Sequence, residues 1–137
     1  MADFYSELKI SALISKLDDV LRFVEIPLRE RGASVKNITT INIAVEEIYV
    51  NIAHYAYETE GGQVNISLSI SDDKVTIVFT DFGVKYNPLE REDPDITLSV
   101  EDRPIGGLGI FMVKKTMDEV AYRYENDSNI FTMVKYL

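Results

Sequence analysis

The chain has 137 residues, enough for one domain with a hydrophobic core, and its 46% hydrophobic and 27% charged residues are typical of a soluble globular protein. The formal net charge of −9 would repel nucleic-acid phosphates, which argues against a protein that binds DNA or RNA. The absence of cysteine excludes disulfides and thiolate metal sites, and no apolar run is long enough to span a membrane. The first residues also lack the features of a signal peptide, so we expect one cytoplasmic domain over residues 1–137.

The N-terminal part of the chain predicts one strand and two helices. Residues 4–10 alternate imperfectly between apolar and polar, as a short first strand does. Apolar residues three and four positions apart over 13–28 predict a helix that Pro27 should kink or end. Ser34 is a candidate N-cap for a second helix, whose apolar row over 38–55 is the clearest helical pattern in the chain.

The rest of the chain predicts two hairpins, a long loop and a third helix. Alternation on both sides of a turn indicates a hairpin over 63–81. Residues 84–105 have no periodicity, and a loop of this length inside a domain is usually a functional lid or a disordered segment. A helix is expected to begin at 106–109, and a second hairpin over 120–136 should turn at 125–129. This order predicts an α+β fold, with a mixed, mainly antiparallel sheet covered by helices on one face.

Two polar residues of the second helix form a candidate site. Glu47 and Asn51 are four residues apart and therefore lie about 40° apart on one helix face. The Asn51 oxygen can bind Mg²⁺, which prefers oxygen ligands, and Glu47 can orient or deprotonate an attacking hydroxyl. Glu46 points about 140° away from Asn51 and is the poorer candidate. The spacing fits an ordinary solvent-exposed helix face equally well.

Two glycine-containing segments could complete a ligand site. Asp81 ends a predicted strand, where its carboxylate can accept a hydrogen bond from an exocyclic amine, and Gly83 lets a ligand approach the backbone. A simple turn explains the same residues. The glycines of 106–109 precede a helix, so their amides can bind an anion and offset the net charge, although a hinge with a close helix–sheet contact is the alternative. Arg103 adds a nearby cation that could reach a phosphate.

The order and spacing of these segments resemble the GHKL ATPase superfamily, which is named for gyrase, a heat-shock chaperone, histidine kinases and a mismatch-repair ATPase. The resemblance is carried by residues 44–57, 81–83 and 103–114. Within the superfamily, the closest likeness is to the stand-alone anti-sigma-factor serine/threonine kinases of bacteria. The resemblance implies a Bergerat-type ATP-binding sandwich with a lid over about 84–105.

The resemblance also implies roles for individual residues. By position, Glu47 matches the catalytic carboxylate and Asn51 the magnesium ligand, while Asp81 matches the acceptor of the adenine amino group, with Gly83 beside it. The glycines at 107 and 109 match those that contact phosphates. The predicted ATP-binding set in this last segment is Arg103, Gly106, Gly107, Leu108 and Gly109.

The chain departs from the family pattern in three places. Many members have a Gly-Thr pair before the last strand, with the threonine near adenine, where this chain has Ser128 and Asn129. No adenine contact is therefore assigned to Asn129 or to Thr132. The histidine usual in the second-helix segment falls at Tyr55, and His54 is displaced by one position. A second glycine that often follows the Asp-x-Gly element is replaced by Val-Lys at 84–85.

These observations predict an anti-sigma-factor serine/threonine kinase that binds Mg-ATP. The implied partners are a sigma factor, which the protein would sequester to regulate transcription, and a STAS-type anti-anti-sigma protein, which it would phosphorylate on serine or threonine. The family commonly dimerises, so a homodimer is expected. The alternative is a non-catalytic, ATP-gated module that binds a regulatory protein. The catalytic half of a histidine kinase is disfavoured because no separate helix bears a phosphoacceptor histidine.

Overall fold

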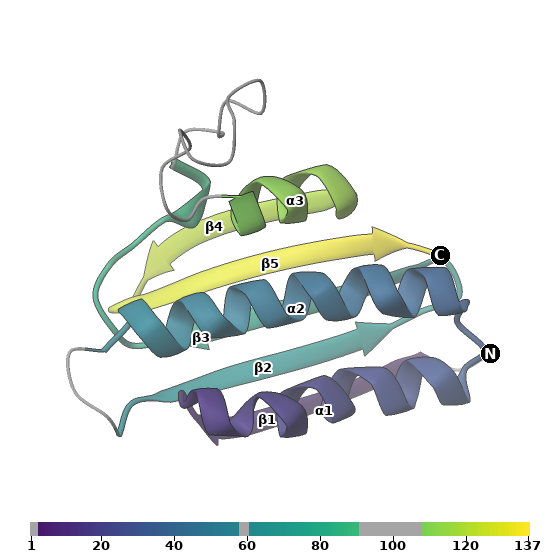
Figure 1. Ribbon diagram of the computed structural model, residues 1–137, viewed down its shortest axis with the longest axis horizontal. Helices are drawn as coiled ribbons and strands as arrows, with labels where there is room; N and C mark the ends of the chain where they lie inside the picture. Colours follow the sequence, from purple (N-terminus) through teal and green to yellow (C-terminus); the bar gives the residue numbers. More distant parts are fainter. Residues whose placement is uncertain (1–2, 58–60, 91–107) are drawn as a thin grey trace.

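The computed structural model describes residues 3–57, 61–90 and 108–137, in which five strands form one sheet and three α-helices cover one face of it (Figure 1). The elements in chain order are β1 Phe4–Ser11, α1 Leu17–Glu30, α2 Val35–Tyr55, β2 Gln63–Ile70, β3 Lys74–Asp81, α3 Leu108–Thr116, β4 Glu119–Glu125 and β5 Ser128–Tyr136. Two short 3₁₀ helices, η1 Ile14–Lys16 and η2 Pro88–Glu90, accompany them. None of these helices is long and apolar enough to cross a membrane.

The sheet has the strand order β1-β2-β3-β5-β4, and each neighbouring pair of described strands is antiparallel. The predicted α+β class is confirmed, with no parallel pair among these strands. Side chains in β2 and β3 alternate between buried and half-exposed, as expected for a sheet with helices on one face. The register pairs Asp81, the last residue of β3, with Asn129 of β5. Two polar residues thus meet at one end of the sheet on central strands.

The first helix differs from its prediction at both ends. It begins at Leu17 rather than at residue 13, because η1 occupies the preceding turn. Pro27 does not end it, and the helix continues to Glu30 because Pro27 lies in the last turn, where its missing N–H removes only one helical hydrogen bond. Gly32, two residues after the end of the helix, has a φ of +77°, a conformation that commonly follows a helix C-terminus.

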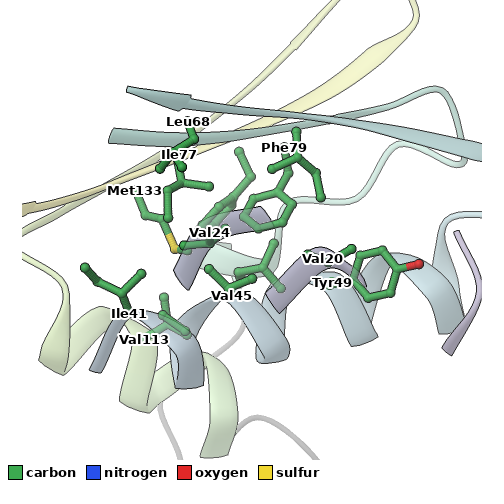
Figure 2. Close-up of a cluster of buried hydrophobic side chains, with 14 of the residues drawn as sticks. Val20, Val24, Ile41, Val45, Tyr49, Leu68, Ile77, Phe79, Val113 and Met133 are labelled. Atoms are coloured by element: carbon green, nitrogen blue, oxygen red, sulfur yellow. The ribbon is translucent and has the colours of Figure 1, made fainter. Parts of the chain in front are cut away.

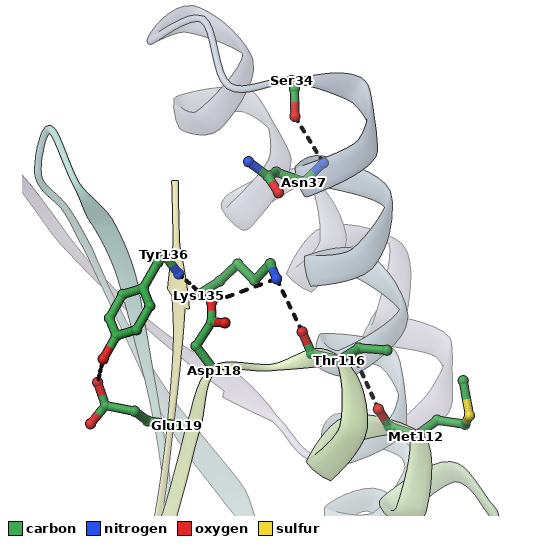
Figure 3. Close-up of polar contacts among 8 residues, drawn as sticks. All are labelled: Ser34, Asn37, Met112, Thr116, Asp118, Glu119, Lys135 and Tyr136. Atoms are coloured by element: carbon green, nitrogen blue, oxygen red, sulfur yellow. Dashed lines mark hydrogen bonds and ion pairs between the residues drawn. The ribbon is translucent and has the colours of Figure 1, made fainter.

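The predicted cap of the second helix is confirmed, and the second hairpin is found with a shorter turn than predicted. The Ser34 hydroxyl caps α2 by accepting a hydrogen bond from the Asn37 N–H at 3.1 Å (Figure 3). The second hairpin turns through Asn126 and Asp127, which have φ values of 52° and 60°. Two consecutive residues of positive φ match the tight turn whose twist suits a hairpin. The turn is therefore shorter than the predicted 125–129.

Helix α2 packs between α1 and α3 against the middle of the sheet (Figures 1 and 2). The fully buried side chains that α2 contributes to the core include Ile41, Val45 and Tyr49. Those that meet them from the sheet and the neighbouring helices include Val20, Val24, Leu68, Ile77, Phe79, Val113 and Met133. This packing holds the polar face of α2 in a fixed position relative to the ends of β3 and β5.

The C-terminal end of α3 is joined to the end of β5 by a polar cluster (Figure 3). The Lys135 ammonium donates to the Thr116 carbonyl at 3.2 Å and lies 3.5 Å from a carboxylate oxygen of Asp118. The same Asp118 oxygen accepts the Tyr136 N–H at 2.6 Å. A cation at a helix C-terminus also interacts favourably with the helix dipole. The cluster therefore fixes the axis of α3 and, with it, the direction in which its N-terminus points.

Candidate functional site

An open pocket lies where β3 ends and β5 begins. Its walls come from α2, from the residues that follow β3, and from β4 and β5. Apolar and aromatic side chains form most of the lining, including Ile48, Ile52, Tyr86, Tyr122 and Phe131. The carboxylate or amide side chains among the lining residues are those of Asn51, Asp81 and Asn129. An apolar pocket with a few converging polar groups is the usual form of a small-molecule site.

Asp81 is a buried carboxylate, with 5% of its surface exposed. Its Oδ1 atom accepts hydrogen bonds from the Gly83 N–H at 3.0 Å and from the Asn129 amide at 2.9 Å. No donor in the described part of the chain reaches Oδ2. Burial raises the pKa of Asp81 above its ordinary value, and the hydrogen bonds from Asn129 and Gly83 oppose that shift. The pocket therefore presents one carboxylate oxygen to a ligand donor.

Gly83 is required by the packing of the chain itself. A Cβ atom at this position would lie 1.9 Å from the backbone oxygen of Ala56, at the end of α2. The next residue, Val84, donates its N–H to that same oxygen at 2.7 Å. The Tyr57 hydroxyl accepts from the Phe82 N–H at 2.9 Å. The turn after β3 is thus attached directly to the C-terminal end of α2, which explains the glycine without a ligand.

Glu47 and Asn51 lie on one face of α2, as predicted from their spacing. The Asn51 side-chain amide donates to the Glu47 backbone oxygen at 2.9 Å and to the Glu47 Oε1 atom at 3.0 Å. Both side chains are half-buried, and Asn51 also lines the pocket. Because the amide nitrogen faces Glu47, the Asn51 oxygen has no donor among the described residues. An oxygen of this kind fits the ligand preference of Mg²⁺.

Gly109 lies directly against the Glu47 carboxylate. A Cβ atom on Gly109 would be 2.0 Å from Glu47 Cδ and 2.2 Å from each carboxylate oxygen. Gly109 is the second residue of α3, so the carboxylate sits at the positive end of that helix. The fold therefore brings together two segments that are far apart in the sequence.

The remaining predicted residues lie at or beyond the limit of the described chain. Arg103, Gly106 and Gly107 are outside the described residues, as is most of the predicted lid at 84–105, whose beginning contains η2. Leu108 is the first residue of α3. In the described ranges, no cluster of three or more His, Cys, Asp or Glu side chains forms a metal site.

Asn129 is a site residue to which the sequence assigned no role. It is 6% exposed and is bonded to Asp81 across the β3–β5 pair. Its position opposite Asp81 depends on the register between β3 and β5, which lie almost 50 residues apart in sequence and whose pairing local patterns do not specify. The one available signal is that an asparagine is uncommon at a buried position of a central strand.

The fold is an α+β sandwich in which one layer of helices covers one open sheet, with the pocket at the end of β3 and the beginning of β5. The family model of the histidine kinase-like ATPase domain matches residues 10–135, and the chain belongs to this family. The predicted resemblance to the GHKL superfamily and the Bergerat-type fold are thereby confirmed. Members of such a family bind ATP, and the pocket is consistent with that ligand.

The curated relatives include serine-protein kinases named RsbW. One from Bacillus cereus (strain ATCC 10987 / NRS 248) is 29% identical over 110 residues, which cover 77% of this chain and 68% of the relative. One from Halalkalibacterium halodurans is 30% identical over 115 residues, covering 77% and 67%. These relatives and the family match confirm the predicted class, an ATP-dependent serine/threonine protein kinase of the anti-sigma type.

A solved structure supports the fold alone. It contains the RsbU and RsbW domains of Rv1364c from Mycobacterium tuberculosis and superposes with a TM-score of 0.64 at 18% identity. The superposition covers 95% of this chain and 32% of the other. This chain thus corresponds to about a third of that larger protein.

Proposed function

We propose that this chain binds Mg-ATP in the pocket and transfers the γ-phosphoryl group to a serine or threonine of an anti-anti-sigma protein. In the same proposal it sequesters a sigma factor in the cytoplasm, as a homodimer, and so regulates transcription. The observation that carries the proposal is the contact between Glu47 and Gly109 at the N-terminus of α3, one helical turn from Asn51. The family and the serine-protein-kinase relatives support it.

The adenine end of the ligand is assigned to Asp81. Its Oδ2 atom would accept a hydrogen bond from the exocyclic amine, while Ile52, Tyr86 and Phe131 enclose the base. A buried carboxylate surrounded by apolar walls favours a ligand that is flat and apolar but carries a donor. An adenine base fits this description.

The phosphate end is assigned to α2 and to the start of α3. The N-terminus of α3 would attract the phosphates through its free N–H groups and its partial positive charge, which offsets the overall charge of −9. The Asn51 oxygen would hold Mg²⁺, whose chemistry is to neutralise phosphate charge and orient the transferred group. Glu47 would accept the proton of the partner's hydroxyl. Little else is required, because phosphoryl transfer depends mainly on positioning and charge neutralisation.

The test begins with ³²P-labelled ATP and candidate anti-anti-sigma proteins, with calorimetry of nucleotide binding in parallel. We expect Mg²⁺-dependent ATP binding and label on a serine or threonine of one partner. Asn51→Ala should remove the Mg²⁺ dependence of the affinity, whereas a metal role for Asn51 is refuted if that dependence is unchanged. If ATP and the partner both bind but no label is transferred, the non-catalytic module replaces the kinase.

A further inference from the structure

The side-chain amide of Asn129 has every hydrogen-bonding position occupied by protein. Its nitrogen donates to Asp81 Oδ1 and to the Val84 carbonyl, each at 2.9 Å. Its oxygen accepts the Tyr86 N–H at 3.1 Å and the Tyr122 hydroxyl at 2.5 Å. An asparagine side chain has two N–H donors and two acceptor lone pairs, so no capacity is left for a ligand. Any effect of Asn129 on a nucleotide must therefore pass through its partners.

The bond to Asp81 determines which carboxylate oxygen faces the pocket. Oδ1 receives two donors, the Asn129 amide and the Gly83 N–H. These two bonds come from different segments and together restrict the rotation of the carboxylate group. Oδ2 is consequently the oxygen that remains for a ligand. Because a buried carboxylate in one orientation recognises a donor better than a rotating one does, the constraint favours selectivity.

The side chain of Asn129 also makes two hydrogen bonds to the backbone, and these hold one wall of the pocket. The amide of Asn129 bonds the Val84 carbonyl and the Tyr86 N–H, two residues apart, as the N–H and C=O of one strand residue do with a neighbouring parallel strand. The side chain thus extends the pairing of β5 beyond Asp81, into the segment after β3. Val84 and Tyr86 both line the pocket. One side chain therefore positions the carboxylate and the wall beside it.

We infer that Asn129 is a positioning residue that makes the pocket selective for a purine with a 6-amino group, by directing Asp81 Oδ2 toward that amine. The inference rests on the proposed ATP function and specifies how the base is chosen.

The test compares calorimetric affinities for ATP and for purine riboside triphosphate, which lacks the 6-amino group. A hydrogen bond to a carboxylate should make the wild type bind ATP about ten- to a hundredfold more tightly. In Asn129→Ala the ratio should fall to about threefold or less, with little change for the analogue. Ser128→Ala is the control, because Ser128 is equally buried, does not line the pocket and donates to the Asn126 carbonyl. It should keep the wild-type ratio.

The possible outcomes separate the inference from the proposed function. If Asn129→Ala weakens both nucleotides equally, the residue has only a structural role and the inference is overturned. Equal wild-type affinities would overturn it as well, while leaving nucleotide binding intact. Binding of neither nucleotide to the wild type would instead refute the proposed function. If Asn129→Ala does not fold, Tyr122→Phe decides: it removes one bond to Asn129 and should lower the ratio by about two- to fivefold, and an unchanged ratio contradicts the inference.

Discussion

The two carboxylates of the site are held in different ways. Asp81 is buried, and its hydrogen bonds arrive from β5 and from the turn after β3. Glu47 is half-buried, and it receives a hydrogen bond from Asn51 one turn along the same helix. The backbone of Gly109 closes the other side of Glu47.

Under the proposed function, this difference separates recognition of the base from phosphoryl transfer. The contacts around Asp81, where the base would bind, come from several elements of the fold, so the geometry there is set by tertiary packing. The contacts around Glu47, where the phosphates would bind, combine a local helix pair with the beginning of α3. We therefore expect mutations at the two ends to affect different measurable quantities, the choice of base and the rate of transfer.

The largest expected effect is on transfer in Glu47→Gln. The amide keeps the size of the side chain but removes the proton acceptor, so the transfer rate should fall by about 10²- to 10⁴-fold. The ATP affinity should stay within about threefold of the wild-type value, because Glu47 is not among the residues that line the pocket proposed for the base. Rapid-quench kinetics with a partner and calorimetry measure the two quantities. Glu46→Gln is the matched control, since Glu46 is exposed on another side of α2. Equal losses in both variants would contradict a catalytic role for Glu47.

A somewhat smaller effect is expected for Gly109→Ala. The added methyl group would overlap the Glu47 carboxylate, so that side chain must move, and displacing a reacting group by about 1 Å can cost about a hundredfold in rate. Alanine should favour the helix by about 1 kcal/mol over glycine, so thermal stability should not fall greatly. The same substitution in a Glu47→Ala background should have little further effect on the rate. If Gly109→Ala lowers the transfer rate of the Glu47→Ala variant by the same factor as it lowers that of the wild type, Gly109 acts independently of Glu47.

Gly83→Ala tests the attachment of the base end to α2. Overlap with the Ala56 backbone, which cannot rotate away, should lower the free energy of unfolding by about 2–3 kcal/mol. Urea denaturation measures this change. Gly32→Ala is a useful comparison, because Gly32 has a φ of +77° but an added Cβ there would meet no atom within 4 Å. This substitution should lower the free energy of unfolding by only about 1 kcal/mol. If the two variants are equally stable, the close packing of Gly83 is not required.

The smallest effect concerns pH. Burial raises the folded-state pKa of Asp81 above its unfolded value, so the stability contributed by this group is fully present below the unfolded pKa and is lost as pH rises through the folded pKa. Asp81→Asn removes this titration. The stability of the variant relative to wild type should therefore increase as pH rises through that interval, which urea denaturation across pH 3–7 measures. The ATP affinity of the wild type should rise over the same pH interval, because the ionised carboxylate is the better hydrogen-bond acceptor. A stability difference that is constant with pH would contradict the raised pKa.

Local patterns predicted most of the fold. The apolar row of α2 and the alternation in both hairpins are periodic over many residues, and each was found where it was expected. Pro27 was predicted to kink or end its helix. The helix runs on to Glu30 because one missing hydrogen bond in a last turn costs less than the packing of α1 stabilises.

The sequence by itself, through residue type, spacing and the family resemblance, predicted Glu47, Asn51, Asp81 and the glycine segment as site residues, and their roles remain predictions. Only the tertiary structure decided that Gly109 touches Glu47, that Gly83 touches α2, and that Asn129 holds Asp81. The physical reason is that residue spacing specifies faces within one helix or strand, whereas the register between β3 and β5 and the approach of α3 to α2 depend on the packing of the whole core.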